Sequence, residues 1–383
     1  MTADILTRLR AALDPDQALA LFRSAIGRES ITGNEANFVG FLEAKMRELG
    51  LNGLSRADFL PGRPNIWGER KGAGDGKRLL FIGHTDTVHV DGWREHWAGT
   101  EREDPFGAPI IDGAVWGRGS GDLKAGITAS LAALSLLDKA GIRLKGDVAI
   151  AFVGDEESGQ PGTGVSAGIK HFVGRIEAGE VAAPDFTVYV EPTRLAVYAA
   201  QIGFFITDIT ITGKSAYFGV PELGKDALRA AHAAMTALWR HSDEVAARAE
   251  HKLTGRGFLL ITGLTGGGYI AVPERCTLSL IRKLLPGESL DTAAAEIDET
   301  RAEVAMLSQS MAGAMGGRGV IEGAPFWSES SFFVNRLGIP AVYCAPGDIR
   351  NCHTFEEHVD VEEYLAGIVG FAAFMARYCG VAD

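Results

Sequence analysis

Apolar positions along the first 200 residues follow two periods, one typical of helices and one typical of buried strands. The first 50 residues carry apolar side chains at helical spacing, among them Phe38, Leu42 and Met46 before Gly50. Short continuous apolar runs then predict strands, separated by an alanine- and leucine-rich helix over 124–141. The predicted strands lie at 65–69, 78–83, 147–154 and 185–191. Strands that alternate with helices favour an α/β fold, with a mostly parallel sheet and helices on both faces.

The pattern changes near residue 200, where strict alternation replaces the continuous apolar runs. The elements predicted next run in the order strand, helix, strand, strand, helix, at 204–214, 225–241, 257–267, 275–284 and 289–307. This order is typical of a ferredoxin-like α+β domain. From about residue 315 the α/β character returns, with a strand at 340–345 and a final helix from Val361. We therefore predict one domain of residues 1–199 and 315–383, with a second domain, residues 200–314, inserted into it.

Composition and charge exclude several classes of protein. A formal net charge of −12 over 383 residues argues against a nucleic-acid partner, because phosphate binding needs a basic surface. No apolar run approaches the roughly 20 residues of a membrane span, and the N-terminal segment lacks the apolar core of a signal peptide. The four cysteines form no C-x-x-C pair, which disfavours a zinc ribbon or a disulfide framework. We expect a cytoplasmic protein that binds neither nucleic acid nor a membrane.

The strand predicted at 78–83 ends in polar residues that suit a metal site. His84 and Asp86 follow Gly83, and a period of two places their side chains on the same side of the strand. A carboxylate beside a metal-binding histidine fixes the imidazole tautomer and raises its basicity. A purely structural histidine explains the same pattern, so other residues must decide between the two interpretations.

Carboxylates also follow the other predicted strands. Asp122 opens the long helix and could simply be its N-cap. Asp155, Glu156 and Glu157 are three adjacent acids, which need solvent or a cation to offset their repulsion. Glu191 ends a predicted strand just before a proline, which is also an ordinary surface position. Taken singly, none of these acids indicates a site.

Their joint occurrence is more informative. In a parallel sheet the carboxyl ends of the strands meet at one edge, where α/β proteins bind ligands. With His353, from a late loop, the acids and His84 form the ligand set expected for two divalent ions bridged by a carboxylate. Two such ions polarise a carbonyl and lower the pKa of a shared water, and a further carboxylate can carry the proton.

Five segments of the chain resemble the motifs of one known family, in the same order and spacing. They read GHTDTV, DPFGAPIIDGAVWGRGSGDLKAG, GDEESG, VEPT and CHTFEEHV. The family is that of the dinuclear zinc-dependent aminoacylases and carboxypeptidases, which includes acetylornithine deacetylase, succinyl-diaminopimelate desuccinylase and glutamate carboxypeptidase. The resemblance implies that residues 1–199 and 315–383 form a zinc-exopeptidase-like catalytic domain. It also implies that residues 200–314 form a lid and dimerisation domain, and therefore a homodimer or a higher homo-oligomer.

The resemblance assigns metal ligands residue by residue. One ion would be bound by His84 and Glu191 and the second by Glu157 and His353, and both would share Asp122. The two ions would be zinc, with manganese or cobalt as alternatives, because a mixed nitrogen and oxygen ligand set suits all three.

The resemblance also gives roles to groups around the ligands. Glu156 would be the general base that deprotonates the water between the metal ions. Asp86 would orient His84. Family members often carry a cis peptide bond after the bridging aspartate, which here would join Asp122 to Leu123. Such a bond is rare outside proline.

The predicted lid departs from the family pattern at two positions. Tyr217 stands where the motif G-K-x-x-H has its histidine, which in relatives often reaches a neighbouring subunit's active site and stabilises the oxyanion. A tyrosine hydroxyl can still donate a hydrogen bond. Ile270 stands where the family usually has an asparagine that binds polar groups of the substrate. The two changes indicate either a specialised substrate or variation in a lid that still serves an ordinary N-acyl amino acid.

Other residues are candidates to bind the substrate. Arg282, Arg318 and Arg350 could bind a substrate carboxylate, although each is also an ordinary surface residue. Aromatic side chains could line a pocket for a ring or form the core of the lid, namely Tyr217, Phe218, Tyr269 and Trp327.

The sequence thus predicts a metal-dependent hydrolase that cleaves a C–N bond in a small substrate, such as an N-acyl amino acid or a dipeptide-like amide. An alternative is a specialised aminohydrolase or amidohydrolase that acts on an aromatic amine or amide, such as a nitroanthranilate-like compound. A non-catalytic metal-binding scaffold is disfavoured by Glu156, because a lapsed enzyme has little reason to keep a base beside a complete ligand set. A nucleotide-binding enzyme would need a G-x-G-x-x-G fingerprint after the first strand, and the sequence has none there.

Overall fold

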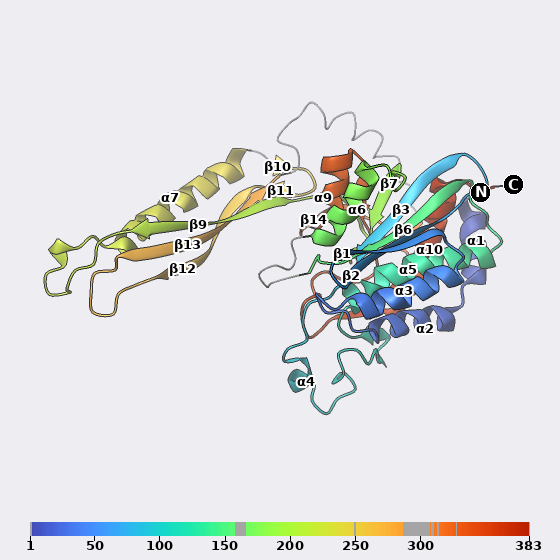
Figure 1. Cartoon of the computed structure of the whole chain (residues 1–383), viewed down its shortest axis with the longest axis horizontal. Coiled ribbons are helices and arrows are strands. Elements are labelled where there is room, and N and C mark those ends of the chain that lie inside the picture. Colours follow the sequence, from blue (N-terminus) through green and yellow to red (C-terminus); the bar gives the residue numbers. More distant parts are fainter. Residues whose placement is uncertain are drawn as a thin grey trace. The chain divides into compact units, whose positions relative to one another are not determined.

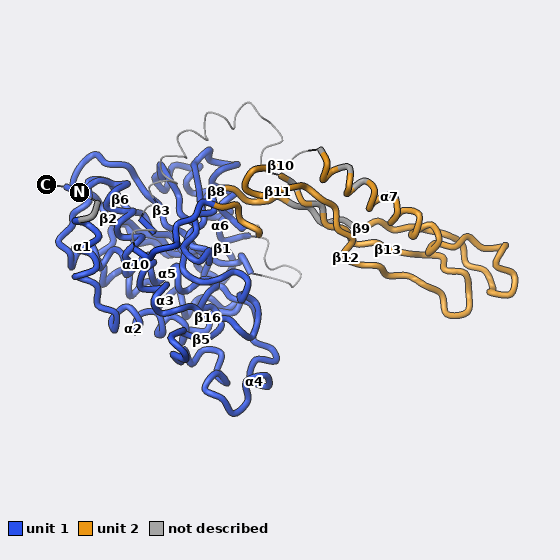
Figure 2. Tube along the Cα trace, turned by 180° about the vertical axis from the view of Figure 1, so that it is seen from behind, with its two compact units in different colours: residues 1–199, 294–321, 328–383 blue, residues 200–293, 322–327 orange. Residues whose placement is uncertain are grey.

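The chain divides into two compact units (Figure 2). A computed structural model describes residues 2–157, 166–248, 250–285, 307, 310–311, 314–326 and 328–382. Unit 1 comprises residues 1–199, 294–321 and 328–383, and unit 2 comprises residues 200–293 and 322–327.

The chain returns to unit 1 earlier than predicted, at residue 294 and not at residue 315. Leu307 and Met311 already belong to unit 1, where both are fully buried. The close approach of Met311 to Gly370 explains this, since a Cβ at Gly370 would lie 2.5 Å from the Met311 sulfur. Residue-by-residue patterns do not reveal this packing, because it joins positions about 60 residues apart.

Unit 1 is built on a mostly parallel sheet (Figure 1). Its strands are ordered β1-β2-β6-β3-β7-β15-β8. Strands β3, β6, β7 and β15 run parallel, whereas β1, β2 and β8 pair in antiparallel fashion. The bounds are Asn52–Leu60 for β1, Arg63–Arg70 for β2, Gly76–His84 for β3, Gly146–Val153 for β6, Phe186–Tyr189 for β7, Val197–Gln201 for β8 and Ala341–Tyr343 for β15. The predicted α/β fold is confirmed.

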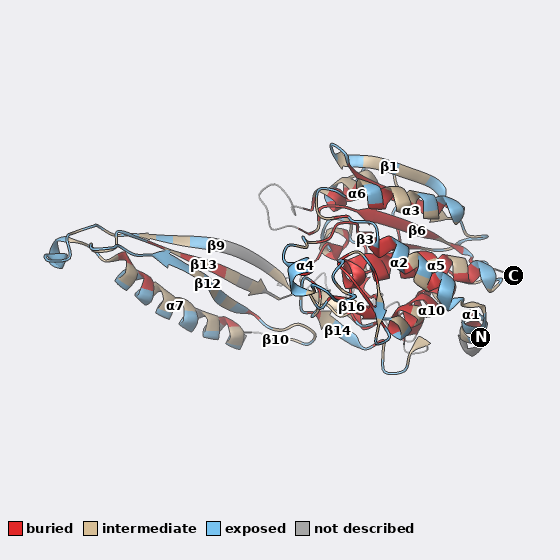
Figure 3. Ribbon diagram, turned by 90° about the horizontal axis from the view of Figure 1, so that it is seen from below, coloured by how far each residue is buried: buried red, intermediate tan, exposed pale blue. Residues whose placement is uncertain are grey.

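Helices cover both faces of this sheet, and the buried residues lie between the layers (Figure 3). The long helices α5 and α10 pack on one face, where Phe371 meets Phe81 of β3 with ring centroids 4.9 Å apart. Helix α6 packs on the other face, where Phe172 meets Trp67 of β2. The helices of this unit are α1 (Thr2–Ala12), α2 (Pro15–Ile26), α3 (Ala36–Glu48), α4 (Trp93–His96), α5 (Ala125–Lys139), α6 (Ala167–Glu177), α9 (Ser330–Phe332) and α10 (Val361–Tyr378).

The register of the central strands brings their carboxyl ends level with one another. His84 pairs with Val153 of β6, and Ile82 pairs with Tyr189 of β7. Gly83 lets the turn before α5 approach this edge, because a Cβ there would lie 2.6 Å from a side-chain carbon of Leu123. The turn itself spans Ser120–Lys124 and has non-helical backbone angles at Asp122 and Leu123. A π-helical segment, Phe333–Leu337, follows α9.

A small sheet of unit 1 holds the late loop of the chain against this turn. It contains β4 (Ile110–Ile111), β5 (Ala114–Trp116) and β16 (His358–Asp360), in the order β16-β5-β4. His358 pairs with Trp116, and their rings stack with centroids 4.4 Å apart. The loop before β16 is thereby fixed next to the segment that leads to the long helix.

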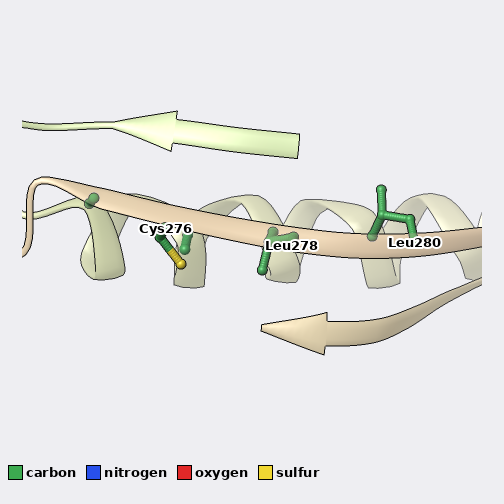
Figure 4. Packing of buried hydrophobic residues seen from close by; sticks show 5 residues of the cluster. Cys276, Leu278 and Leu280 are labelled. Atoms are coloured by element: carbon green, nitrogen blue, oxygen red, sulfur yellow. The ribbon is translucent and has the colours of Figure 1, made fainter. Parts of the chain in front are cut away.

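In its described residues, unit 2 is a three-stranded antiparallel sheet packed against one helix. The sheet order is β12-β13-β9, with bounds Phe258–Gly266, Arg275–Leu284 and Gly203–Thr212, and the helix is α7 (Ala227–Arg248). Its core is shown in Figure 4 and contains Ala227, Ala231, Cys276, Leu278 and Leu280. Shorter elements are the 3-10 turn Pro221–Leu223, β10 (Glu250–His251) and β11 (Gly255–Arg256), and β14 (Ile321–Ala324) lies where the chain returns to unit 2.

The order of elements in unit 2 is the predicted strand, helix, strand, strand. The last predicted helix, near 289–307, falls almost entirely outside the described residues. Within the part of the chain that is described, no helix combines the length and the apolar character that crossing a bilayer requires. The four cysteines are all buried and unpaired.

Candidate metal centre

Five potential metal ligands from distant parts of the sequence meet at the carboxyl edge of the parallel sheet. His84 ends β3, Glu157 follows β6, Glu191 follows β7, His353 follows β15, and Asp122 lies in the turn before α5. Two groups of three form around one shared residue: His84, Asp122 and Glu191, and Asp122, Glu157 and His353. Within each group the ligand atoms all lie within 4.8 Å of one another. The sequence analysis expected the carboxyl ends of the strands to meet at one edge, and the family resemblance named these five residues.

The two oxygens of Asp122 face different histidines. Oδ1 lies 3.0 Å from His84 Nε2, and Oδ2 lies 3.1 Å from His353 Nε2. Glu191 Oε1 lies 3.8 Å from His84 Nε2, and Glu157 Oε1 lies 2.6 Å from His353 Nε2. A carboxylate placed in this way can be shared between two ions, each with its own histidine and its own glutamate.

The donor set fits two divalent cations. Asp122 Oδ1 is buried and completes no hydrogen bond with the described residues, although His84 lies beside it. Burial and the neighbouring Asp122 charge raise the pKa of Glu157 to about 8, and burial with the same charge raises the pKa of Glu191 well above its usual value. Buried carboxylates that repel one another in this way need protons or cations to offset their charge.

Asp86 contacts His84 differently from the sequence-based expectation. His84 Nδ1 lies 3.0 Å from the backbone carbonyl oxygen of Asp86, but 3.7 Å from its carboxylate. With the proton on Nδ1 this contact leaves Nε2 free to act as a ligand. The Asp86 carboxylate instead accepts the backbone N–H groups of Glu156 at 3.3 Å and Glu157 at 2.9 Å, and the Thr32 hydroxyl at 3.1 Å. The carboxylate therefore holds the loop that carries the two glutamates.

Glu156 lies beside both ligand groups but belongs to neither of them. Its carboxylate comes within 4.8 Å of ligand atoms of His84 and Glu157, and its side chain is only half-buried. Burial, together with the charges of Asp122 and Asp86, raises the pKa of Glu156 to about 7. A carboxylate with this pKa can take up and release a proton near neutral pH.

The peptide bond between Asp122 and Leu123 is cis. This bond was expected from the resemblance to the dinuclear zinc family, and the prediction is confirmed. Asp122 and Leu123 both have non-helical backbone angles inside the turn before α5.

Comparison with known proteins identifies the family. The profile of Peptidase family M20/M25/M40 matches residues 80–377, which include all five potential ligands. The chain belongs to this family. The recognition made from the five sequence segments is thereby confirmed.

Individual relatives agree with this membership. A succinyl-diaminopimelate desuccinylase 2 from Ruegeria sp. is 33% identical over 232 residues, which cover 58% of this chain and 53% of the relative. The desuccinylase of Beijerinckia indica is 32% identical over 212 residues, which cover 54% of this chain and 52% of the relative. The chain thus spans about half the length of the curated relatives it matches.

Solved structures share the fold. An M20 family metallo-carboxypeptidase from Sulfolobus solfataricus superposes with a TM-score of 0.72 at 16% identity, over 96% of this chain and 99% of that one. A dinuclear metal-binding M20 peptidase from Bacillus subtilis superposes with a TM-score of 0.63 at 15% identity, over 95% and 98% of the two chains.

The structure adds residues that the sequence interpretation missed. Ser328 donates a hydrogen bond of 2.6 Å to Glu191 Oε1. Next to it, Glu329 is fully buried and accepts a hydrogen bond of 2.8 Å from the Tyr189 hydroxyl. Burial and the Glu156 charge raise the pKa of Glu329 well above its usual value. An acid among serines and aromatic residues, in the segment FWSESSFF, was the available sequence signal.

The candidate substrate residues of unit 2 lie away from its core. Tyr217 is 61% exposed, forms a β-bridge with Ala271 and packs against Phe218 with ring centroids 4.5 Å apart. Tyr269 and Ile270 are also exposed. The interpretation of these aromatic residues as lid core is therefore wrong.

The candidate arginines differ in what the structure describes. Arg350 makes two hydrogen bonds from Nε and one from Nη2 to Asp348, so its guanidinium is held by an acid of its own chain. Arg318 likewise pairs with Glu363 at 2.8 Å. Arg282 is in β13, opposite Leu259, but its side chain lies outside the described residues, as does Trp327.

Proposed function

We propose that this M20 family member is a dinuclear metal-dependent hydrolase that cleaves the amide C–N bond of a small N-acyl amino acid or a dipeptide-like substrate. The observation that carries the proposal is the pair of ligand groups sharing Asp122, with Glu156 beside both. Neither group alone would distinguish a catalytic site from a structural metal site. A shared carboxylate together with an additional, partly accessible acid suits hydrolysis of an amide by two metal ions and a general base.

In this proposal His84 and Glu191 hold one ion, Glu157 and His353 hold the other, and Asp122 contacts both. Zinc is the first ion to test, with manganese or cobalt as alternatives, because all three bind mixed nitrogen and oxygen donors. When bound, a pair of divalent ions polarises the scissile carbonyl and lowers the pKa of the attacking water.

The proton is carried by Glu156. Its carboxylate takes a proton from the attacking water as the new C–O bond forms. The resulting carboxylic acid then gives the proton to the leaving nitrogen as the C–N bond breaks. A pKa of about 7 for Glu156 suits both transfers, because an acid-base group works best when its pKa is near the working pH. Asp86 supports this by holding the Glu156 backbone N–H at 3.3 Å.

The substrate class is proposed from the curated relatives. Two of them are named succinyl-diaminopimelate desuccinylase, so N-succinyl and N-acetyl amino acids are the first compounds to test. Tyr217 would donate a hydrogen bond to the developing oxyanion, and Arg282 would bind a substrate carboxylate. Unit 2 would then act as a lid.

A second candidate substrate is an aromatic amide or amine. It is favoured by the exposed aromatic residues of unit 2, since the neighbouring rings of Tyr217 and Phe218 offer a surface on which a planar substrate could pack. In this case the reaction would still break a C–N bond at the same centre.

The test is hydrolysis by protein loaded with Zn²⁺, Mn²⁺ or Co²⁺. A panel would contain N-succinyl and N-acetyl amino acids, dipeptides, and aromatic amides and amines. Turnover of one of these classes, lost on chelation and restored by metal, supports the proposal. A protein that binds two ions per chain and hydrolyses none of them would instead favour a metal-binding scaffold.

A further inference from the structure

Glu357 joins the two segments that carry Asp122 and His353. It lies four residues after His353 and is 1% exposed. Its Oε1 accepts hydrogen bonds from the backbone N–H groups of Gly121 and Asp122, both at 3.1 Å. Its Oε2 accepts a hydrogen bond from Arg118 Nη1. One buried side chain thus connects the turn before α5 to the late loop.

The late loop depends on such anchoring for its geometry. His353 has a positive φ of 61°, which is uncommon for a residue other than glycine, so neighbouring contacts must hold it there. The turn and the loop are also closely packed, because a Cβ at Gly121 would lie 3.1 Å from the sulfur of Cys352. A shift of one segment is therefore transmitted to the other.

Arg118 holds the Glu357 carboxylate in place. Arg118 is 3% exposed, and its guanidinium lies 5.2 Å from the centre of the Trp93 ring. Replacing one member of a buried ion pair leaves the other charge uncompensated, which is destabilising. The pair therefore holds the carboxylate in a single orientation, facing the two amides.

We propose that Glu357 is a positioning residue that sets the spacing between Asp122 and His353, and thereby the affinity for the second metal ion. This inference rests on the proposed dinuclear function. Asp122 and His353 both belong to the second ligand group, whereas only Asp122 belongs to the first. Loss of Glu357 therefore weakens the second site more than the first.

The experiment is calorimetric titration of the metal-free chain with Zn²⁺, for the wild type, Glu357→Gln and Glu357→Ala. Substitution of a group that orients metal ligands typically lowers metal affinity 10- to 100-fold. We expect a loss of about this size at the second site in Glu357→Ala, and a change within a few-fold at the first. Glu357→Gln should fall between, because its amide oxygen still accepts the two backbone N–H groups but its NH₂ faces Arg118.

Glu356→Gln is the matched control. Glu356 is the preceding residue, its side chain is 55% exposed, and the substitution removes the same charge from the same loop. This variant should bind both ions as the wild type does. Glu357→Gln decides the question if Glu357→Ala does not fold.

Two results would overturn the inference about Glu357 and leave the proposed function intact. Equal weakening of both sites would indicate a general effect of charge, and unchanged affinities with only a lower melting temperature would indicate a purely structural role. A wild-type chain that binds a single zinc ion would contradict the proposed function itself, and this inference with it. Wild-type binding of two ions, with selective loss in the Glu357 variants, supports both.

Discussion

Asp122 is the residue on which the site depends most. One of its oxygens lies 3.0 Å from His84 Nε2, and the other lies 3.1 Å from His353 Nε2. Nearly equal distances of this kind suit a carboxylate that two metal ions share. Around it, residues with similar side chains differ in environment. Glu157 is buried within a ligand group, whereas Glu156 is partly accessible and has a pKa of about 7. In the proposed function, this difference in environment assigns Glu157 as a metal ligand and Glu156 as the general base.

Tyr217 offers a direct test of whether unit 2 contributes to the proposed reaction. Removal of its hydroxyl in Tyr217→Phe should lower kcat about 10-fold or more with little change in KM, if the hydroxyl stabilises the transition state. The ring and its packing against Phe218 are kept. Steady-state kinetics on the best substrate of the panel measure this, with Tyr269→Phe as a matched control on another exposed tyrosine. Unchanged kcat in Tyr217→Phe would exclude a catalytic hydroxyl.

At the scale of elements, a buried ionic network supports the loop after β6. Arg63, at the start of β2, pairs with Asp155 at 2.7 Å and with Glu35, which precedes α3. Both acids are fully buried. Asp155 has a positive φ of 77° and also accepts the backbone N–H of Ala167 at the start of α6. The network therefore connects β2, α3 and α6 to Asp155, the residue directly before Glu156.

Arg63→Met should unfold more easily than the wild type. It leaves two buried acids without their cation, and breaking a buried ion pair in this way typically costs about 3–5 kcal/mol. The free energy of unfolding in urea measures the change. Arg56→Met is the control, since Arg56 pairs with Glu43 at the surface, and an exposed pair is worth only about 0–1 kcal/mol. Equal stability of the two variants would show that the network is not structural.

The sequence predicted some strands of unit 1 and missed others, for physical reasons. Strands β3, β6 and β7 were predicted because they are buried on both faces and read as continuous apolar runs. Strand β1 was not predicted, because it lies at the edge of the sheet with exposed or half-buried side chains, and its sequence NGLSRADFL has no continuous apolar run. The ends of the predicted strands indicated candidate metal ligands, and the family resemblance named them. The partners of Arg63 could not be predicted, because they lie 28 and 92 residues away along the chain.

At the scale of the whole molecule, we propose that unit 2 mediates a homodimer. Strand β12 is at the edge of its sheet, and Leu260 and Leu264 on it are 52% and 51% exposed. An exposed apolar edge strand invites pairing with another chain. Size-exclusion chromatography with light scattering should give the mass of a dimer for the wild type.

Replacing two exposed leucines of β12 by aspartate tests the proposed interface. The double variant Leu260→Asp, Leu264→Asp should give the mass of a monomer, because paired acids would repel across the interface. Leu60→Asp, at an exposed leucine of β1 in unit 1, should remain dimeric. A double variant with the wild-type mass would place the interface elsewhere.

The central claim is that a shared pair of metal sites cleaves an amide with Glu156 as the acid-base group. Its most direct test is Glu156→Gln, measured for zinc content and for turnover in the same preparation. We predict two zinc ions per chain, as in the wild type, and a turnover about 10²- to 10⁴-fold lower, the usual contribution of a general acid or base. Turnover within a few-fold of the wild type, with both ions bound, would contradict the account.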